Sequence, residues 1–157
     1  MAEASLLSLA DESETLAFGA KLAEFLRPGD VVALSGDLGA GKTTLARGLL
    51  AALGLEDEAP SPSFAIVQPY ERPEVRLPVW HVDLYRIEDP EDALELGLDD
   101  ARQDAVLLIE WPERLGDDLW NDSLLLRLER SPEGGRRLTA ELPQAWEDRW
   151  PALLRTQ

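Results

Sequence analysis

The 157-residue sequence contains no cysteine, and this absence excludes several kinds of chemistry. Without thiols the chain has no disulfide, no cysteine nucleophile and no thiolate metal ligand. Long apolar runs are missing too, because none approaches the roughly 18 residues that suggest a bilayer span. The first residues, MAEASLLSLADE, lack a basic stretch and turn acidic at once, so neither a secretory nor a mitochondrial signal is readable. We therefore expect a cytoplasmic protein without a membrane segment.

Basic residues are scarce. The chain has 15 lysines and arginines against 31 aspartates and glutamates, a net charge of −16. The arginines are scattered, and only Arg136 and Arg137 are adjacent. A chain this acidic repels nucleic acid unless a local basic patch overrides the field, and no such patch is visible. Two interpretations stay open: a solvated acidic surface, or a surface that docks onto a basic partner protein.

What is present is typical of one globular domain, 1–157, because the length and the 45% hydrophobic content are sufficient for an apolar core. Hydrophobic periodicity predicts its elements in order. These are a helix at 13–26, a strand at 30–36, a helix at 42–53, antiparallel strands at 64–70 and 75–86, a helical stretch at 89–103, a strand from 105, strands at 123–130 and 136–142, and a short helix bearing Trp146 and Trp150. This order predicts an α/β fold of the P-loop NTPase type: a central, mostly parallel sheet with antiparallel additions, flanked by helices.

The stretch GDLGAGKTT, residues 36–44, has the composition of a phosphate-binding loop. Its glycines let the backbone wrap closely around a polyphosphate, and its N–H groups and the following helix's positive end stabilise the anion. Lys42 would place a cation on the β- and γ-phosphates, and the Thr43 hydroxyl can bind Mg²⁺. The alternative, a glycine-rich turn without function, is disfavoured because the stretch lies between an apolar strand and a helix.

Two carboxylates are candidates for a functional role beside this loop. Glu110 ends an apolar run, which places it at the same sheet edge as the phosphate loop and makes it a Walker B candidate. Asp83 lies in VWHVDLYR, where alternation gives an apolar face and a polar face, typical of a half-buried strand. Each of these acids could instead be an ordinary surface carboxylate. His81, the one histidine, could be structural or catalytic, and Trp111 could pack in the core or lie beside a nucleotide.

Four motifs together resemble one family. GDLGAGKTT, SPSF at 61–64, HVDLYR at 81–86 and IEWPER at 109–114 stand in the order and approximate spacing of the TsaE (YjeE) family, and DESETLAFGAKLA resembles its opening helix. The resemblance covers about residues 11–115. Members of that family are P-loop ATPases of bacterial tRNA threonylcarbamoyladenosine (t6A) biosynthesis.

The resemblance implies a role for individual residues. ATP would be held by Leu38, Gly39, Ala40, Gly41, Lys42, Thr43 and Thr44, with Trp111 close by and Asp11 to Thr15 approaching the adenine. Thr43 and Glu110 would hold Mg²⁺, and Asp83 would be the carboxylate needed for turnover. SPSF resembles a switch-like loop near the γ-phosphate, but Ser63 stands where the family usually has threonine, so that a hydroxyl is kept.

The resemblance also implies partners. Family members act with TsaB and TsaD, and TsaD transfers the threonylcarbamoyl group to adenosine 37 of tRNA. The expected cofactors are therefore ATP and Mg²⁺, the expected activity is a Mg²⁺-dependent ATPase that is weak alone, and tRNA would be met only through the complex.

Other classes of protein stay open. A small-molecule P-loop kinase would share the phosphate loop but needs an acceptor pocket and usually an arginine-bearing lid, and nothing after Gly97 resembles such a lid. A GTPase would need Asn-Lys-x-Asp and Asp-x-x-Gly, and neither string occurs. A non-catalytic nucleotide-sensing module is disfavoured by the presence of Asp83 and Glu110.

Overall fold

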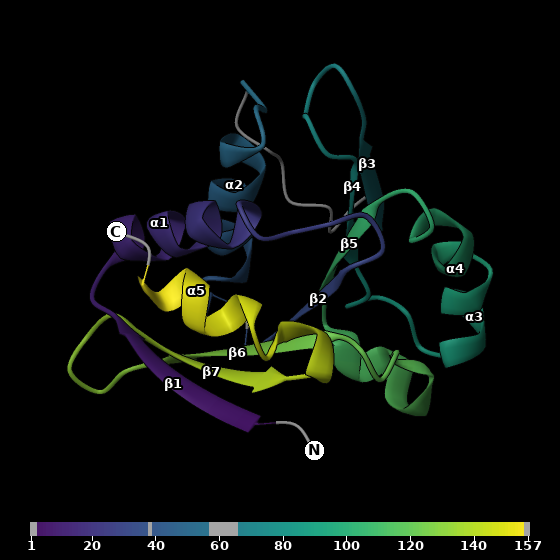
Figure 1. Ribbon diagram of the computed structural model, residues 1–157. Coiled ribbons are helices and arrows are strands. Elements are labelled where there is room, and N and C mark those ends of the chain that lie inside the picture. Colours follow the sequence, from purple (N-terminus) through teal and green to yellow (C-terminus); the bar gives the residue numbers. More distant parts are fainter. Residues whose placement is uncertain (1–2, 38, 57–65, 156–157) are drawn as a thin grey trace.

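The computed structural model describes residues 3–37, 39–56 and 66–155 (Figure 1). In this part of the chain seven strands form one sheet in the order β1-β7-β6-β2-β5-β4-β3. The strands are β1 Glu3–Leu9, β2 Val31–Ser35, β3 Val67–Tyr70, β4 Val79–Asp83, β5 Val106–Glu110, β6 Leu124–Arg130 and β7 Arg136–Leu142. Strands β6, β2, β5 and β4 are parallel, whereas β1, β7 and β3 pair antiparallel. This confirms the predicted α/β fold with a mostly parallel core.

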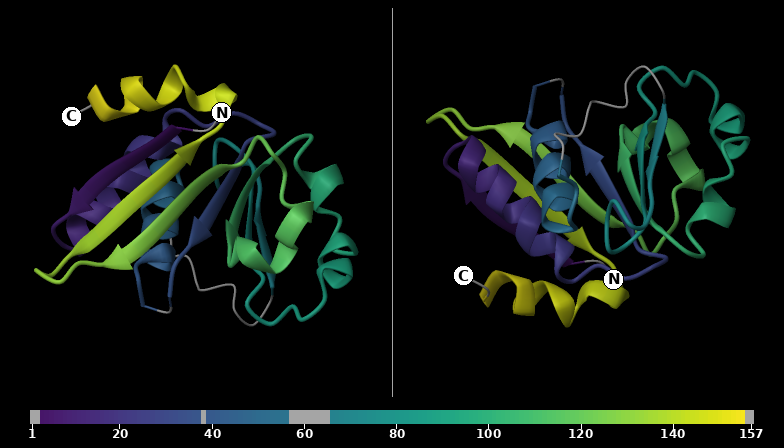
Figure 2. Two further views of the ribbon diagram at one scale, coloured as in Figure 1. Left: turned by 90° about the horizontal axis from the view of Figure 1, so that it is seen from below. Right: turned by 90° about the horizontal axis from the view of Figure 1, so that it is seen from above.

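Helices cover the sheet on both faces (Figures 1 and 2). One face carries α1 Glu12–Ala23, α2 Lys42–Ala52, the 3-10 helix η2 Gln144–Trp146 and α5 Arg149–Arg155. The other carries α3 Pro90–Leu94, α4 Leu98–Ala101 and the 3-10 helix η1 Pro112–Asp118. Successive residues of β5 alternate between the two apolar clusters, since Leu108 joins the first and Leu107 and Ile109 the second. A strand covered on both faces has to be apolar throughout, as this run is.

Helix α2, which carries the phosphate loop on its N-terminal end, is held by a close approach to α1. A Cβ at Gly19 would collide with the backbone of Leu45, and one at Gly48 with the backbone of Leu16. Two glycines therefore allow the helix backbones to touch, because any side chain there would force them apart. This contact places the first turn of α2 relative to α1.

The C-terminal helices lie against this same layer. Arg149 donates to both carboxylate oxygens of Asp30, at 2.7 and 3.0 Å, and to the carbonyl of Phe25 at 2.8 Å. Trp150 packs edge-on against Phe18 of α1, with ring centroids 5.8 Å apart. A bidentate Arg–carboxylate pair fixes geometry as well as adding energy, so α5 is anchored to the start of β2.

Several predicted elements differ from the structure. Strand β1 was not predicted, and it pairs with β7 over Glu3 to Leu9. The helical stretch at 89–103 is two short helices, because Gly97 between them is left-handed with φ 75°. The long strand at 75–86 is only β4, since 75–77 form a bend and 85–86 a turn. The C-terminal helix is η2 followed by α5.

The prediction of a half-buried strand at β4 was also wrong. His81 is fully buried and Asp83 is 7% exposed, so the polar face is covered as well. The reason is that both faces of β4 are covered, since Val79 belongs to the first apolar cluster and Val82 to the second. Among the described residues, no helix is both long and apolar enough to cross a membrane.

Candidate active site

The phosphate loop connects β2 to α2, as its position in the sequence predicts. Gly36 and Gly41 have φ of 141° and 109°, conformations that residues with a Cβ rarely adopt. A Cβ at Gly36 would also collide with the carbonyl of Leu128 on β6. The glycines therefore allow both the turn and its close contact with the sheet. Leu38 and the SPSF segment with Ser63 lie outside the described residues.

Lys42 is the first residue of α2 and is only 4% exposed. Its Nζ donates to the carbonyl of Gly36 at 2.7 Å and lies 3.6 Å from the centroid of the Trp111 ring. Burial lowers the pKa of Lys42, and the carboxylates of Glu110, Glu113, Asp83 and Asp37 act in the opposite direction. A buried cation among acids, held by one loop carbonyl, is well placed to accept an anionic ligand.

Asp83 and Glu110 end the neighbouring parallel strands β4 and β5 and are partners in register. The Oε1 atom of Glu110 lies 3.5 Å from the Thr43 hydroxyl, which donates to it. The Asp83 Oδ1 accepts a hydrogen bond from the Tyr85 N–H at 2.9 Å. Burial raises the pKa of Asp83, the Tyr85 N–H lowers it, and the charge of Glu110 raises it further. The structure thus brings both predicted carboxylates to the predicted hydroxyl and lysine.

Trp111 follows Glu110 directly and turns the chain out of β5. Its backbone is left-handed, with φ 60° and ψ 51°, an uncommon conformation for a bulky residue. The ring packs over Lys42 and against Tyr85, with a centroid separation of 5.0 Å from the tyrosine ring. The sequence left open whether Trp111 is core or lies beside the site. The structure places it half-buried and in contact with the loop lysine.

Two adjoining cavities lie along the loop. A cavity of about 240 Å³ is lined by Gly39, Gly41, Lys42, Thr43, Thr44, Asp83, Tyr85, Glu110, Trp111 and Arg136. Its neighbour, of about 330 Å³, is lined by Ala10, Asp11, Glu12, Thr15, Gly41, Thr44, Gly135 and Arg136. The two share Gly41, Thr44 and Arg136. Asp11 and Thr15, predicted to approach the adenine, therefore line a cavity next to the one that contains the lysine and the carboxylates.

A third cavity, of about 700 Å³, also touches the loop. It is lined by Ser35, Gly36, Asp37, Ala40, Trp111, Glu113, Arg127, Leu128, Glu129 and Arg130. The predicted residue Ala40 is 2% exposed and faces this space instead of the two smaller cavities. The largest of these three cavities is therefore not the one where Lys42, Thr43 and the two carboxylates meet.

Asp11 has a structural role in addition to any contact with a ligand. It is the N-cap of α1, and its Oδ1 accepts hydrogen bonds from the Glu14 N–H at 3.0 Å and the Ser13 hydroxyl at 2.7 Å. These donors lower the pKa of Asp11, with the Ser13 hydroxyl the largest cause. Thr15, one turn further, is 1% exposed.

Two arginines at the loop were missed by the sequence analysis. Arg136 and Arg130 come from the β6–β7 hairpin, and both donate to the carbonyl of Gly39, at 3.1 and 3.5 Å. The Arg136 Nε is buried and has no hydrogen-bond partner among the described residues. The pair Arg136-Arg137 was visible in the sequence, but no local pattern places a hairpin from the last third of the chain beside residue 39.

The residues present fit a Mg²⁺·nucleotide. The cradle is glycine-lined, its lysine and arginine are held by loop carbonyls, and a hydroxyl and a carboxylate oxygen lie 3.5 Å apart at its edge. Mg²⁺ is usually bound through one or two carboxylates together with substrate phosphates, instead of by an all-protein cage. Among the described residues, no group of three or more acidic or histidine side chains could hold a metal ion.

Comparison with known proteins assigns the family. The sequence model described as "Threonylcarbamoyl adenosine biosynthesis protein TsaE" matches residues 9–138. The chain belongs to the TsaE family. The TsaE protein of Streptomyces coelicolor is 44% identical over 114 residues, which is 72% of this chain and 77% of that protein. The TsaE protein of Bacillus subtilis is 38% identical over 127 residues, or 80% and 78%.

The fold comparison agrees with the TsaE assignment. The crystal structure of Bacillus subtilis YdiB superposes with a TM-score of 0.79 at 30% sequence identity. The match covers 98% of this chain and 93% of that one. It therefore includes the part of the chain after residue 115, which the resemblance of the motifs did not cover.

Proposed function

We propose that residues 1–157 act as one Mg²⁺-dependent P-loop ATPase domain of the tRNA t6A modification machinery, working with TsaB and TsaD. The observation that carries the proposal is the convergence of Lys42, Thr43, Asp83 and Glu110 on one cavity at the end of the glycine loop. The named TsaE relatives support the process. ATP hydrolysis, both partners and a cytoplasmic location are part of the proposal.

Different residues of the chain would bind the phosphates, hold Mg²⁺ and activate the attacking water. The loop N–H groups and Lys42 would bind the β- and γ-phosphates, because helix N-termini and charge-assisted hydrogen bonds favour anions. Thr43 and Glu110 would hold Mg²⁺, which supplies charge neutralisation on the phosphate oxygens. Asp83 lies at the same edge with a raised pKa, which suits a group that orients or accepts a proton from the attacking water.

Adenine would occupy the neighbouring cavity. Asp11 and Thr15 line it, and Arg136 lies between this cavity and the one with the carboxylates. The bound nucleotide would then extend from Asp83 and Glu110, across the glycine loop, to the start of α1. Trp111 would lie on the phosphate side, beside Lys42.

Two properties are proposed to depend on partners. The net charge of −16 opposes direct binding of a polyanion, so tRNA would be met through the complex. Two arginines at the loop, Arg130 and Arg136, are bound to the Gly39 carbonyl. A partner surface that reorders this region or adds a cation would then raise turnover.

The test is the fate of the γ-phosphate. Purified protein with ATP and Mg²⁺ should release phosphate to water slowly, and faster when TsaB and TsaD are added. Transfer of the phosphate to a small acceptor, with no response to TsaB and TsaD, would replace the proposal with the kinase alternative.

A further inference from the structure

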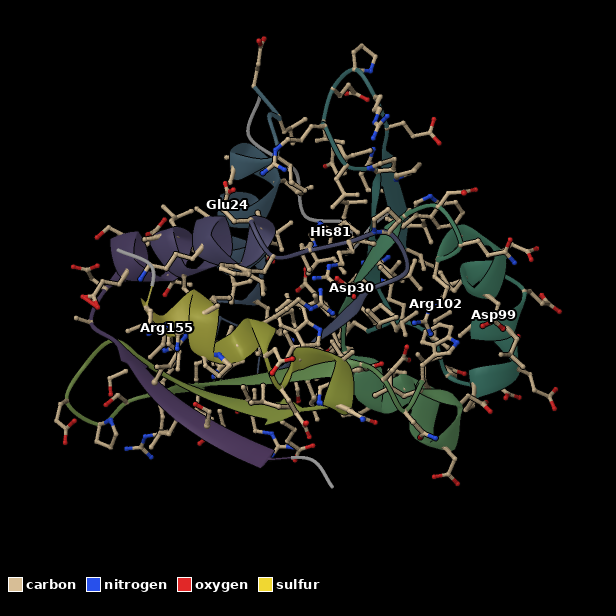
Figure 3. The ribbon with its side chains drawn as sticks, viewed as in Figure 1. Glu24, Asp30, His81, Asp99, Arg102 and Arg155 are labelled. Atoms are coloured by element: carbon tan, nitrogen blue, oxygen red, sulfur yellow. The ribbon has the colours of Figure 1, made fainter. Side chains whose placement is uncertain are left out.

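Among the described residues, the side chain of His81 makes its one polar contact with the carboxylate proposed to hold the metal. It lies on β4, is fully buried, and its Nε2 is 2.7 Å from Oε2 of Glu110. Figure 3 labels His81 in the interior of the molecule. Its Nδ1 is buried and has no hydrogen-bond partner among the described residues. An ionised carboxylate only accepts, so this contact requires the tautomer in which Nε2 carries the hydrogen and donates it.

This contact divides the two oxygens of Glu110 between two elements. Oε2 is engaged by His81 from β4, while Oε1 lies 3.5 Å from the Thr43 hydroxyl on α2. A carboxylate at a strand end can otherwise rotate about its last torsion, which is broad. With Oε2 held by His81 and Oε1 next to the Thr43 hydroxyl, this rotation is restricted, and Oε1 is the oxygen that contacts the loop's end.

We propose that His81 is a positioning residue that holds Oε2 of Glu110, so that Glu110 meets Mg²⁺, or a water bound to it, through Oε1 alone. The inference rests on the proposed function of the site. Partners that hold a metal ligand from behind fix its orientation and raise metal affinity. Among the described residues the ring's hydrogen bonding is directed to Glu110 alone, because Nε2 contacts its carboxylate and Nδ1 has no partner.

Three variants of His81 distinguish the effect of its hydrogen bond to Glu110 from the effect of its volume. His81→Gln places an amide N–H at about the reach of Nε2, His81→Asn places the same group one bond shorter, at the reach of Nδ1, and His81→Phe keeps a ring without a donor. Each is first compared with the wild type by melting temperature. ADP affinity is then measured by calorimetry without Mg²⁺ and over a range of Mg²⁺ concentrations.

We expect the variants to weaken Mg²⁺ binding and to leave nucleotide binding without Mg²⁺ unchanged. ADP affinity without Mg²⁺ should stay within about twofold in all variants, while the Mg²⁺ concentration for half-saturation should rise at least about tenfold in His81→Asn and His81→Phe. His81→Gln should restore most of the wild-type response. An unchanged Mg²⁺ response in His81→Phe would show that His81 only fills space. If the wild type shows no Mg²⁺-dependent nucleotide binding at all, the proposed function fails first.

A second readout needs neither nucleotide nor turnover. Because the chain has one histidine, the imidazole ¹⁵N spectrum reports His81 alone. The metal-free protein should show a protonated Nε2, a bare Nδ1 and a slowly exchanging ring proton, and Glu110→Gln should shift the Nε2 signal. A proton on Nδ1 alone, or a spectrum indifferent to Glu110→Gln, would overturn the inference even if the His81 variants fail to fold.

Discussion

Asp83 and Glu110 are register partners at the ends of adjacent parallel strands, so their side chains leave the sheet at the same edge. Both are largely buried, at 7% and 3% exposure, and burial, followed by the charge of Glu110, raises the pKa of Asp83. Two carboxylates held this close in a poorly solvated place are costly unless a cation joins them. Lys42 and a bound metal ion would supply that charge.

The lysine should decide nucleotide binding. Lys42→Ala removes a buried cation at the loop and should weaken ATP·Mg²⁺ binding by at least about 3 kcal/mol, roughly a hundredfold in Kd. Lys21→Ala, which changes the only other lysine, is the matched control and should bind as the wild type does. Calorimetry measures both. Equal Kd values for Lys42→Ala and the wild type would remove the phosphate-loop assignment.

The carboxylates should affect turnover more than folding. Asp83→Asn and Glu110→Gln remove charge with little change of shape, and each should lower Mg²⁺-dependent ATP hydrolysis at least about tenfold, or 1.4 kcal/mol of barrier. Glu141→Gln, at an exposed position of β7, controls for the charge change. Phosphate release at saturating Mg²⁺ measures the rates. Two variants with wild-type rates would mean that these acids play no part in the reaction.

Asp83→Asn should stabilise the folded protein, although it should slow ATP hydrolysis. Because burial raises its pKa, the folded protein holds this proton more tightly than the unfolded chain does, and the ionised form costs stability near pH 7. Asp83→Asn should therefore raise the melting temperature of the metal-free protein by a few degrees at pH 7. The advantage should vanish as the pH falls through the raised pKa toward 3.8, where the wild type is protonated too. A lower melting temperature at pH 7 would contradict this sign.

The arginine at the loop should contribute to nucleotide affinity. Arg136→Ala removes the guanidinium that lies between the two smaller cavities and should raise the Kd for ADP about tenfold, the effect of one charge-assisted contact. Arg137→Ala changes the next residue, which is exposed and points to the other side of β7, and should have little effect. If the two variants bind ADP equally, Arg136 only braces the Gly39 carbonyl.

Features of the fold and the site that depend on residues close together in the sequence could be predicted. The phosphate loop follows from glycines that a single turn requires, and Glu110 from its place at the end of an apolar run, so both were readable. The stretch at 89–103 was predicted as one helix but is two, because the left-handed residue Gly97 interrupts a continuous helical pattern. Contacts such as His81 with Glu110 and Arg136 with Gly39 join distant segments, and only the strand order brings them together. Strand β1 was missed for the same reason, because its partner β7 lies more than a hundred residues away.

The central claim is an ATPase that depends on its partners. ATP turnover with Mg²⁺ should be measured for the isolated protein and again with purified TsaB and TsaD, with Lys42→Ala as the blank. The account predicts slow hydrolysis alone and a rise of at least about tenfold in the mixture, the effect of one added charge-stabilising contact. Rapid hydrolysis by the isolated chain that TsaB and TsaD leave unchanged would contradict it.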